Sequence, residues 1–127
     1  KEINLTEMAA HHAAQKGLVT IAVVEVPNPR DYGVTVLDGH RVLEYLEKPA
    51  DPPANLISSG LCLIDPRVRE YVRHHAEGGE KVVMIEKVLF PALAKAGKLF
   101  AYTSRGQWFD CGNLARWEEA IRRWRAG

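Results

Sequence analysis

Residues 18–26 read LVTIAVVEV, an almost wholly apolar run that is rich in β-branched side chains. Such a run predicts a strand buried within a sheet. Pro27-Asn28-Pro29 follows it, and the strand should end there because proline cannot donate to a strand ladder. Two further β-rich runs, residues 34–37 and 41–46, flank Asp38-Gly39-His40. An Asp-Gly pair between such runs is a strong hairpin signal, so we predict two antiparallel neighbours.

Helical patterns alternate with these strands. Asn4 and Glu7 have the spacing of a capping box, and the alanine-rich segment after them predicts a helix to Lys16, with Gly17 in the left-handed terminal position. The other expected elements are a buried strand over residues 56–64, a helix from Asp65-Pro66 to about Ala76 stopped by Gly78-Gly79, two short helices within residues 82–96 separated at Pro91 and closed by Gly97, a strand over residues 99–104, and a last helix capped by Asn113. This alternation predicts an α/β fold.

The bulk composition is that of one globular domain covering residues 1–127, with 46% hydrophobic and 26% charged residues. A net charge of +1 gives no field that would attract nucleic acid or an anionic membrane. Cys62 and Cys111 are too few for a disulfide framework and match no metal-ligand spacing, so we expect a cytoplasmic setting. No apolar run approaches the roughly 18 residues of a membrane span. The chain lacks an initiator Met and enters a helical pattern at once, so we expect it to be part of a longer protein.

Three short segments carry side chains that could do chemistry. Pro49 should force Lys48 into extended backbone, so that Glu47 and Lys48 point to opposite sides of the strand. The carboxylate could then accept from a sugar hydroxyl while the ammonium meets a phosphate, although a solvated surface pair has the same pattern.

The other two segments each allow two interpretations. Ser58-Ser59-Gly60 interrupts an apolar strand, and a glycine there indicates either a β-bulge or the close approach of a ligand. Asp110 lies between Trp108-Phe109 and Gly112, where it could be an oxygen ligand for a hard cation or a structural, hydrogen-bonded aspartate.

The order of the motifs along the chain narrows these choices. The chain contains, in sequence, Tyr32-Gly33-Val34, Glu47-Lys48-Pro49, Asn55 to Gly60, the helix opening Asp65-Pro66, Glu86 to Pro91, and Trp108 to Gly112. At this spacing they resemble the second half of the sugar-phosphate nucleotidylyltransferases, the nucleotide-sugar pyrophosphorylases of the mannose-1-phosphate guanylyltransferase and glucose-1-phosphate thymidylyltransferase type. The resemblance spans essentially the whole chain. It implies the carboxyl-terminal part of a Rossmann-like nucleotidyltransferase domain, a mixed sheet flanked by helices.

The resemblance also implies the reaction and two catalytic residues. Lys48 would hold the sugar phosphate, and Asp110 would help bind the Mg²⁺ that bridges the phosphates. The sugar-1-phosphate oxygen would attack the nucleotide α-phosphate and pyrophosphate would leave, so the chemistry is positioning and charge neutralisation.

The remaining site residues would bind the sugar. Glu47 would accept hydrogen bonds from sugar hydroxyls, and Gly33 and Gly60 would approach the sugar through their backbones, which requires the missing Cβ. Ser58 and Trp108 complete the expected substrate-binding set. Ser58 departs from the family pattern, because a single hydroxyl stands where many members have the amide of asparagine.

The expected partners follow from the same resemblance. They are a sugar-1-phosphate, a nucleoside triphosphate and a missing amino-terminal half, because the family's glycine-rich nucleotide signature and first metal-binding aspartate would precede residue 1. We therefore expect no activity from the chain alone. Strand edges left open by the absent half should favour a homo-oligomer.

Two other functions fit parts of the sequence. The parent could be a non-catalytic nucleotide-sugar sensor or regulatory subunit of the same fold, although Glu47, Lys48 and Asp110 argue against it. A nucleic-acid-binding module could use the four arginines of the last helix, but Glu118 and Glu119 dilute that cluster and favour a solvated face.

Aromatic and histidine pairs on the helices have structural interpretations. Trp117 and Trp124 are seven residues apart on one helical face and are expected to be packing residues. The pairs His11-His12 and His74-His75 are expected to face solvent, because adjacent helical residues point about 100° apart and rarely share one metal ion.

Overall fold

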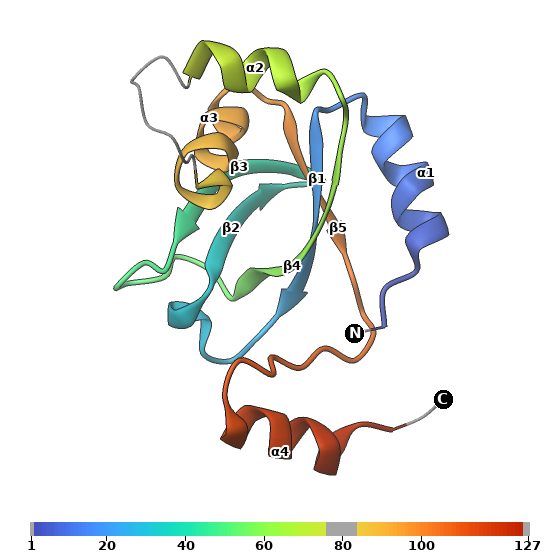
Figure 1. Cartoon of the computed structure of the whole chain (residues 1–127), viewed down its shortest axis with the longest axis vertical. Coiled ribbons are helices and arrows are strands. Elements are labelled where there is room, and N and C mark those ends of the chain that lie inside the picture. Colours follow the sequence, from blue (N-terminus) through green and yellow to red (C-terminus); the bar gives the residue numbers. More distant parts are fainter. Residues whose placement is uncertain (1, 76–83, 126–127) are drawn as a thin grey trace.

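The structure, a computed structural model, describes residues 2–75 and 84–125. In chain order the elements are α1 (Leu5–Gln15), β1 (Val19–Glu25), the short 3-10 turn η1 (Pro29–Asp31), β2 (Gly33–Asp38), β3 (Arg41–Glu47), β4 (Leu56–Ile64), α2 (Val68–His75), the π-helical turn η2 (Ile85–Leu89), α3 (Phe90–Lys95), β5 (Leu99–Thr103) and α4 (Leu114–Arg123). Figure 1 shows the strands at the centre, with α1 to one side, α2 and α3 at the upper end and α4 set apart below. The expected α/β class is confirmed. The predicted helix stop at residues 78–79 lies outside the described residues.

The five strands form a mixed sheet in the order β1, β4, β2, β3, β5, and its two ends meet in a closed ring. β1 runs parallel to β5 and antiparallel to β4, and β2 and β3 form the predicted hairpin. Two seams consist of a single registered pair each, Val34 with Ile57 and Arg41 with Phe100. The family resemblance implied a mixed sheet, but nothing in the sequence indicated that the sheet closes into a ring.

Asn4 and Asn113 cap their helices as predicted, whereas the Glu7 carboxylate, the other half of the expected capping box, accepts a hydrogen bond from the Tyr102 hydroxyl at 3.0 Å. The Asn4 Oδ1 accepts hydrogen bonds from the amides of Thr6 and Glu7, both at 3.1 Å, and the Asn113 Oδ1 accepts from the Arg116 amide at 3.0 Å. These bonds satisfy amides that have no partner within the first helical turn.

The end of α1 differs from the prediction. Lys16, and not Gly17, takes the left-handed conformation, with φ of 54°. Gly17 is instead pressed against β5, where the Phe100 Cδ2 lies 2.4 Å from the position that a Cβ would occupy.

The segment around Pro91 is one continuous helical element, not two separated helices. The π-helical turn η2 runs directly into α3, and Pro91 lies at the start of α3. A proline ring would collide with the carbonyl four residues earlier in a regular α-helix. The π-helical turn η2 holds one more residue than an α-helical turn, and this extra residue lies where the collision would occur. The expected disruption at Pro91 is therefore present as a change of helix type, and Gly97 closes the element with φ of 66°.

The core lies between the inner faces of the strands and the helices α2 and α3. Its larger cluster of buried residues consists of Leu18, Val19, Ile21, Val23, Val42, Tyr45, Val68, Leu89, Phe90, Leu93, Ala94, Leu99 and Ala101. A smaller cluster, Val24, Val34 and Ile57, lies at the opposite end of the strands. Among the described residues, no helix has the length and apolar character that crossing a membrane requires.

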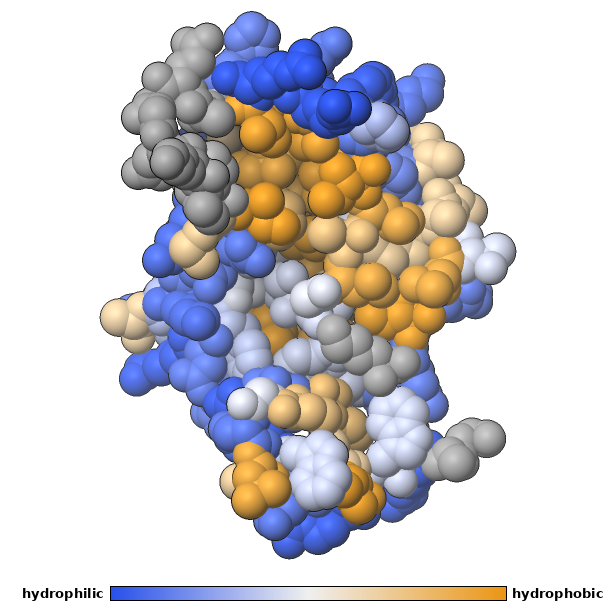
Figure 2. Space-filling model, viewed as in Figure 1, coloured by the Kyte–Doolittle hydropathy of each residue, from blue (hydrophilic) through white to orange (hydrophobic). Residues whose placement is uncertain are grey.

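The last helix does not pack as expected. None of the residues of α4 is buried against the described part of the chain, and Trp117 and Ile121 are 49% and 58% exposed. Trp124 is 42% exposed and meets the Phe109 ring edge to face, with ring centroids 6.2 Å apart. The prediction that the two tryptophans are packing residues is therefore wrong for Trp117. Figure 2 shows apolar and aromatic side chains on the exposed surface of α4.

The histidines of α1 also differ from the prediction. His11 and His12 are half-buried, and the His12 Nδ1 lies 2.8 Å from the Thr20 Oγ1 of β1. His74 is exposed as expected.

Candidate functional site

The predicted site residues gather at the end of the ring where β2 begins and β3 ends. Gly33, the first residue of β2, is paired with Glu47, the last residue of β3. A Cβ on Gly33 would lie 2.0 Å from the Tyr45 Oη and 3.2 Å from the Glu47 Oε2. No other residue fits there without moving both side chains. The immediate reason for glycine at position 33 is therefore the space that Tyr45 and Glu47 occupy.

Tyr45 was not singled out by the sequence, yet it contacts the candidate sugar-binding carboxylate. Its hydroxyl donates to the Glu47 Oε2 over a long 3.4 Å. Burial raises the pKa of Tyr45 well above its usual range, and the carboxylates of Glu47 and Glu86 add to the shift. The hydroxyl therefore keeps its proton and remains a donor to Glu47.

Lys48 does not have the predicted backbone conformation. Instead of the extended form, it adopts a left-handed conformation with φ of 48°. The prediction considered only the collision between Pro49 and right-handed helical backbone. The Lys48 amide donates to the Tyr32 carbonyl at 3.1 Å, and this bond holds the residue in a conformation that non-glycine residues rarely adopt. The ammonium is carried on the exposed surface next to Glu47.

The Ser58-Ser59-Gly60 segment forms a β-bulge. Ile21 and Val23 of β1 are two residues apart but pair with Cys62 and Ser58, which are four residues apart in β4. Gly60 takes φ of 81° within this bulge. The bulge interpretation is confirmed, and it has a consequence for the site, since the Ser59 carbonyl accepts a hydrogen bond from the Trp108 Nε1 at 3.3 Å.

Asp110 lies in a dense network of donors. Its Oδ1 accepts from the Gly112 amide at 2.8 Å. Its Oδ2 accepts from the Tyr32 hydroxyl at 3.1 Å and from the Arg116 Nη1 at 2.6 Å. Burial pushes the Asp110 pKa upward, but these three donors outweigh burial and hold the pKa below its usual range. The carboxylate is therefore ionised near neutral pH.

Two members of this network, Asp31 and Arg116, were not among the site residues predicted from the sequence. Arg116 donates a second hydrogen bond, from its Nη2 to the Asp31 Oδ2, so one guanidinium bridges two carboxylates. Asp31 was assigned no role, and Arg116 was placed on a solvated helical face. Asp31 and Arg116 are 85 residues apart in the chain, so no local pattern could have joined them.

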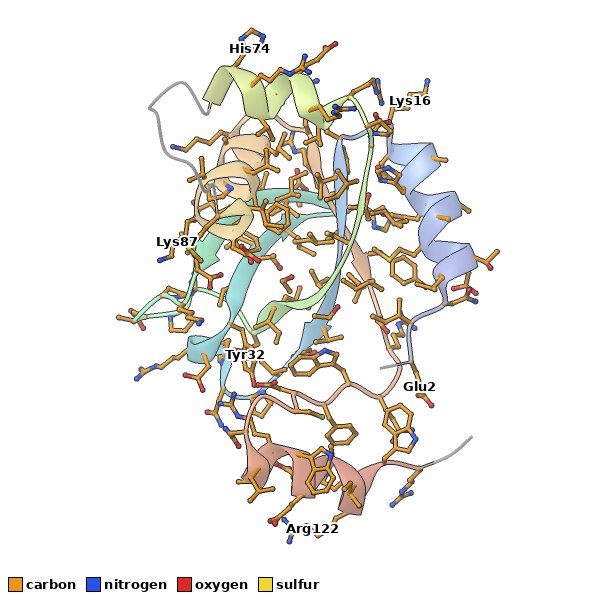
Figure 3. All side chains as sticks on the ribbon, in the orientation of Figure 1. Glu2, Lys16, Tyr32, His74, Lys87 and Arg122 are labelled. Carbon is orange, nitrogen blue, oxygen red and sulfur yellow. The ribbon has the colours of Figure 1, made fainter. Side chains whose placement is uncertain are left out.

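Tyr32 connects the two parts of the site. Its carbonyl holds Lys48, its hydroxyl binds Asp110, and its ring meets Trp108 edge to face at 5.5 Å between centroids. Figure 3 shows Tyr32 at the lower end of the strands, above α4. The structure thus brings Gly33, Glu47, Lys48, Ser58, Gly60, Trp108 and Asp110 to one end of the sheet.

A cavity of about 1190 Å³ lies between this end of the sheet and α4. Tyr32, Trp108, Asp110 and Arg116 line it, whereas Glu47 and Lys48 do not. Figure 2 shows the surface hollowed above α4. Asp110 therefore faces a space that could admit a sizeable ligand, with the Glu47-Lys48 pair outside it.

Asp31 and Asp110 are two carboxylates of this cavity that could hold a metal ion. Within residues 2–75 and 84–125, no three His, Cys, Asp or Glu side chains gather in an arrangement that could hold a metal ion. Asp31 and Asp110 do converge on one cation, the guanidinium of Arg116. Magnesium is commonly bound by one or two carboxylates together with substrate phosphates, so this oxygen donor set fits it.

Comparisons with known proteins agree on one family. A family model described as nucleotidyl transferase matches residues 1–126. The chain is 34% identical to the mannose-1-phosphate guanylyltransferase catalytic subunit beta of Xenopus tropicalis, covering 84% of this chain and 28% of that protein. It is also 34% identical to mannose-1-phosphate guanylyltransferase 1 of Arabidopsis thaliana, covering 87% of this chain and 30% of the relative. The chain thus spans less than a third of these relatives.

A solved structure shares the fold. A protein described as a glucose-1-phosphate thymidylyltransferase of Bacillus anthracis, solved in complex with a sucrose, superposes with a TM-score of 0.78 at 22% identity. The match covers 99% of this chain and 52% of that chain.

Proposed function

Because the chain belongs to the nucleotidyl transferase family, we propose that it is the sugar-phosphate-binding half of an enzyme that makes nucleotide-sugars. The parent enzyme would join a sugar-1-phosphate to the nucleotidyl group of a nucleoside triphosphate and release pyrophosphate. The strongest support is that Tyr32 contacts both Lys48 and Asp110, and so connects the Glu47-Lys48-Pro49 motif with the Trp108 to Gly112 motif. The guanylyltransferase names of the relatives favour mannose 1-phosphate as the first sugar to test.

Glu47 and Lys48 are proposed to bind the two ends of the sugar-phosphate. Glu47, held by Tyr45 in the space that Gly33 leaves, would accept hydrogen bonds from sugar hydroxyls. Lys48, fixed by its strained backbone, would meet the phosphate with a charge-assisted hydrogen bond. The bulge at Ser58 and Gly60, tied down by Trp108, would form one wall for the sugar.

The proposed reaction forms one bond and breaks another at the same phosphorus. The sugar-phosphate oxygen attacks the nucleotide α-phosphorus, and the bond to the β-phosphate oxygen breaks as pyrophosphate leaves. Magnesium bound at Asp110 would neutralise charge on the phosphates as it develops. The chain's own residues would orient the nucleophile: Lys48 would fix the attacking phosphate, and Tyr32 would hold the carboxylate of Asp110 in place.

Equilibrium binding of sugar-phosphate to this chain tests the proposal. Mannose 1-phosphate and glucose 1-phosphate would be titrated while the backbone amides are followed by NMR. Lys48→Ala should weaken binding roughly ten- to a hundredfold, because a charge-assisted hydrogen bond contributes about 1.5 to 3 kcal/mol. Glu47→Gln should instead reduce discrimination between the two sugars.

The control is Lys87→Ala, which removes an exposed lysine from η2, outside the site. It should bind both sugar-phosphates like the unaltered chain. Unchanged affinity in Lys48→Ala, with the fold verified by its amide spectrum, would rule out Lys48 as the phosphate contact.

A further inference from the structure

Arg116 occupies the position of a cation between two carboxylates. It lies in the first turn of α4, and its Nη1 and Nη2 reach Asp110 and Asp31 respectively. Asp31 belongs to η1 and Asp110 to the segment before α4, so the guanidinium joins three parts of the chain. Its Cζ lies 5.6 Å from the centroid of the Tyr32 ring, which adds a cation–π contact.

The acceptor sites of Asp110 are nearly filled. A carboxylate has about four lone-pair sites, and the donors from Gly112, Tyr32 and Arg116 take three of them. Two donors share the Oδ2, and one of them is charged. A divalent cation that binds Asp110 through this oxygen therefore competes with Tyr32 and Arg116, and Arg116 is the competitor that carries the like charge.

We infer that Arg116 is a built-in competitor of the divalent cation for Asp110. It holds the two carboxylates together when no cation is bound, and it gives up Asp110 when one arrives. The inference depends on the role proposed for Asp110 as a magnesium ligand. Arginine suits the task because its guanidinium stays charged and its fork geometry matches two carboxylates at once.

The contacts of Arg116 make the exchange feasible. Its side chain is 36% exposed, so the pair with Asp110 is partly screened by water and can break without leaving a buried charge. Asp31 is more exposed than Asp110, and it can stay paired with the guanidinium after the pair between Arg116 and Asp110 breaks. α4 is also held by Gln107, whose side chain exchanges two hydrogen bonds with the backbone of Arg125 at 2.7 and 3.0 Å.

A permanent structural brace would show the same ion pairs but a different response to mutation. If Arg116 only braces α4 against η1, its removal leaves Asp110 less well ordered and no better at binding a cation. If Arg116 competes, its removal frees a lone pair of Asp110 and cation affinity rises.

The test measures binding of Mn²⁺ alone to the chain, by the paramagnetic broadening of its amide signals. Arg116→Gln should bind Mn²⁺ roughly three- to tenfold more tightly than the unaltered chain, with broadening centred on the Gly112 amide. This gain in affinity corresponds to the interaction free energy of one or two partly exposed ion pairs. Arg116→Lys keeps the charge but loses the fork, and its affinity should fall in between.

Arg123→Gln is the matched control. It removes the same charge from the same helix, but Arg123 pairs with Glu119 at 2.6 Å and not with Asp110. Its Mn²⁺ affinity should stay near that of the unaltered chain, whereas Asp110→Asn should abolish the broadening at Gly112.

Three results would overturn the inference: equal or weaker Mn²⁺ binding by Arg116→Gln, the same gain in Arg123→Gln, or no Mn²⁺ binding by any variant. The amide spectrum of each variant verifies that α4 is still folded. Mannose 1-phosphate binding is measured on the same samples. Its loss would contradict the proposed function without affecting the competition at Asp110.

Discussion

Lys48 shows how a single residue can carry strain at a candidate site. A lysine with φ of 48° has its Cβ crowded against its own backbone, which costs roughly 1 to 2 kcal/mol. Such conformations persist where the surroundings enforce them and are found most often at functional sites. Here the surroundings are Pro49 and the hydrogen bond to the Tyr32 carbonyl. Lys16 has a similar φ of 54° as the helix cap of α1, whereas no helix end accounts for the conformation of Lys48.

Lys48→Gly should affect the free energy of unfolding and the binding of sugar-phosphate in different ways. Glycine adopts this conformation freely, so the free energy of unfolding should stay the same or rise by up to about 1 kcal/mol, even though the unfolded chain gains entropy. Binding of mannose 1-phosphate should weaken roughly ten- to a hundredfold, as in Lys48→Ala. Urea denaturation and NMR titration measure the two effects. Lys87→Gly, in the helical turn η2, should instead destabilise by about 1 kcal/mol; a similar loss in Lys48→Gly would contradict the strain assigned to it.

His11 should make stability depend on pH. Its ring is half-buried and meets His40 and Tyr102 at 4.6 and 5.8 Å between centroids. Burial lowers its pKa below the ordinary value of 6.5, and the neighbouring His40 adds to the shift. The unfolded chain, whose His11 keeps the ordinary pKa, therefore takes up this proton at a higher pH than the folded chain does.

Stability should consequently fall as pH is lowered through 6.5 toward the folded-state pKa of His11. Urea midpoints measured across this window should show the decline in the unaltered chain and a flatter profile in His11→Gln. His74→Gln, which changes an exposed histidine of α2, serves as the control and should keep the original slope. An unchanged slope in His11→Gln would show that His11 is not responsible.

At the scale of elements, α3 and α4 have opposite relations to the core. Leu93 of α3 is completely buried within the larger core cluster. α4 has an equally regular apolar spacing but stands across the cavity from the sheet, with its apolar stripe exposed. Apolar periodicity alone identified both helices but could not tell which of them is buried. It reports which side of a helix is apolar and not what covers that side.

Alanine substitutions should separate these two helices. Leu93→Ala should lower the free energy of unfolding by about 2 to 5 kcal/mol, because it leaves a cavity in a filled core. Ile121→Ala in α4 should change it by less than about 0.5 kcal/mol, as expected for an exposed position. Chemical denaturation of both variants measures the difference. At concentrations where the chain is monomeric, a loss of several kcal/mol in Ile121→Ala would mean that α4 is packed against the body in solution.

At the scale of the whole molecule, two features could drive self-association: the strand edges along the seams and the exposed apolar surface of α4. The sequence led us to expect open strand edges, and although the ring closes, each of its two seams is a single registered pair, so the strands along the seams are paired over a short stretch only. The apolar surface of α4 provides another reason for self-association, because Trp117, Ile121 and their helical neighbours Leu114 and Trp124 are all exposed.

We therefore predict that the purified chain self-associates through α4. Sedimentation velocity should show an average mass that rises with protein concentration, and Ile121→Arg should shift the chain toward the monomer. Leu43→Arg, at another exposed apolar position, is the control and should leave the association unchanged. A monomer at every accessible concentration would refute the prediction.

We also predict that the chain alone has no catalytic activity. It contains the candidate groups for sugar and phosphate but no glycine-rich segment that could surround the nucleotide phosphates, and it spans less than a third of its guanylyltransferase relatives. Assays with mannose 1-phosphate, magnesium and each common nucleoside triphosphate should release no pyrophosphate. Steady release that Asp110→Ala abolishes would disprove this.

The sequence by itself determined the features that depend on neighbours a few residues apart. Alternation and β-branched runs specified the strands, Asp38-Gly39 specified the hairpin, and Asn4 and Asn113 specified two helix starts. The candidate segments Glu47-Lys48 and Trp108 to Asp110 were also identified, and they do lie at the same end of the sheet.

Only the tertiary structure decided how these segments act on one another. It gave Lys48 its left-handed backbone, made Gly33 the space for Tyr45 and Glu47, and placed Arg116 between Asp31 and Asp110. The physical reason is that each arrangement depends on sheet register and on contacts between segments up to 85 residues apart. Local propensities act within a few residues of the chain, so they cannot specify which distant donor reaches a given carboxylate.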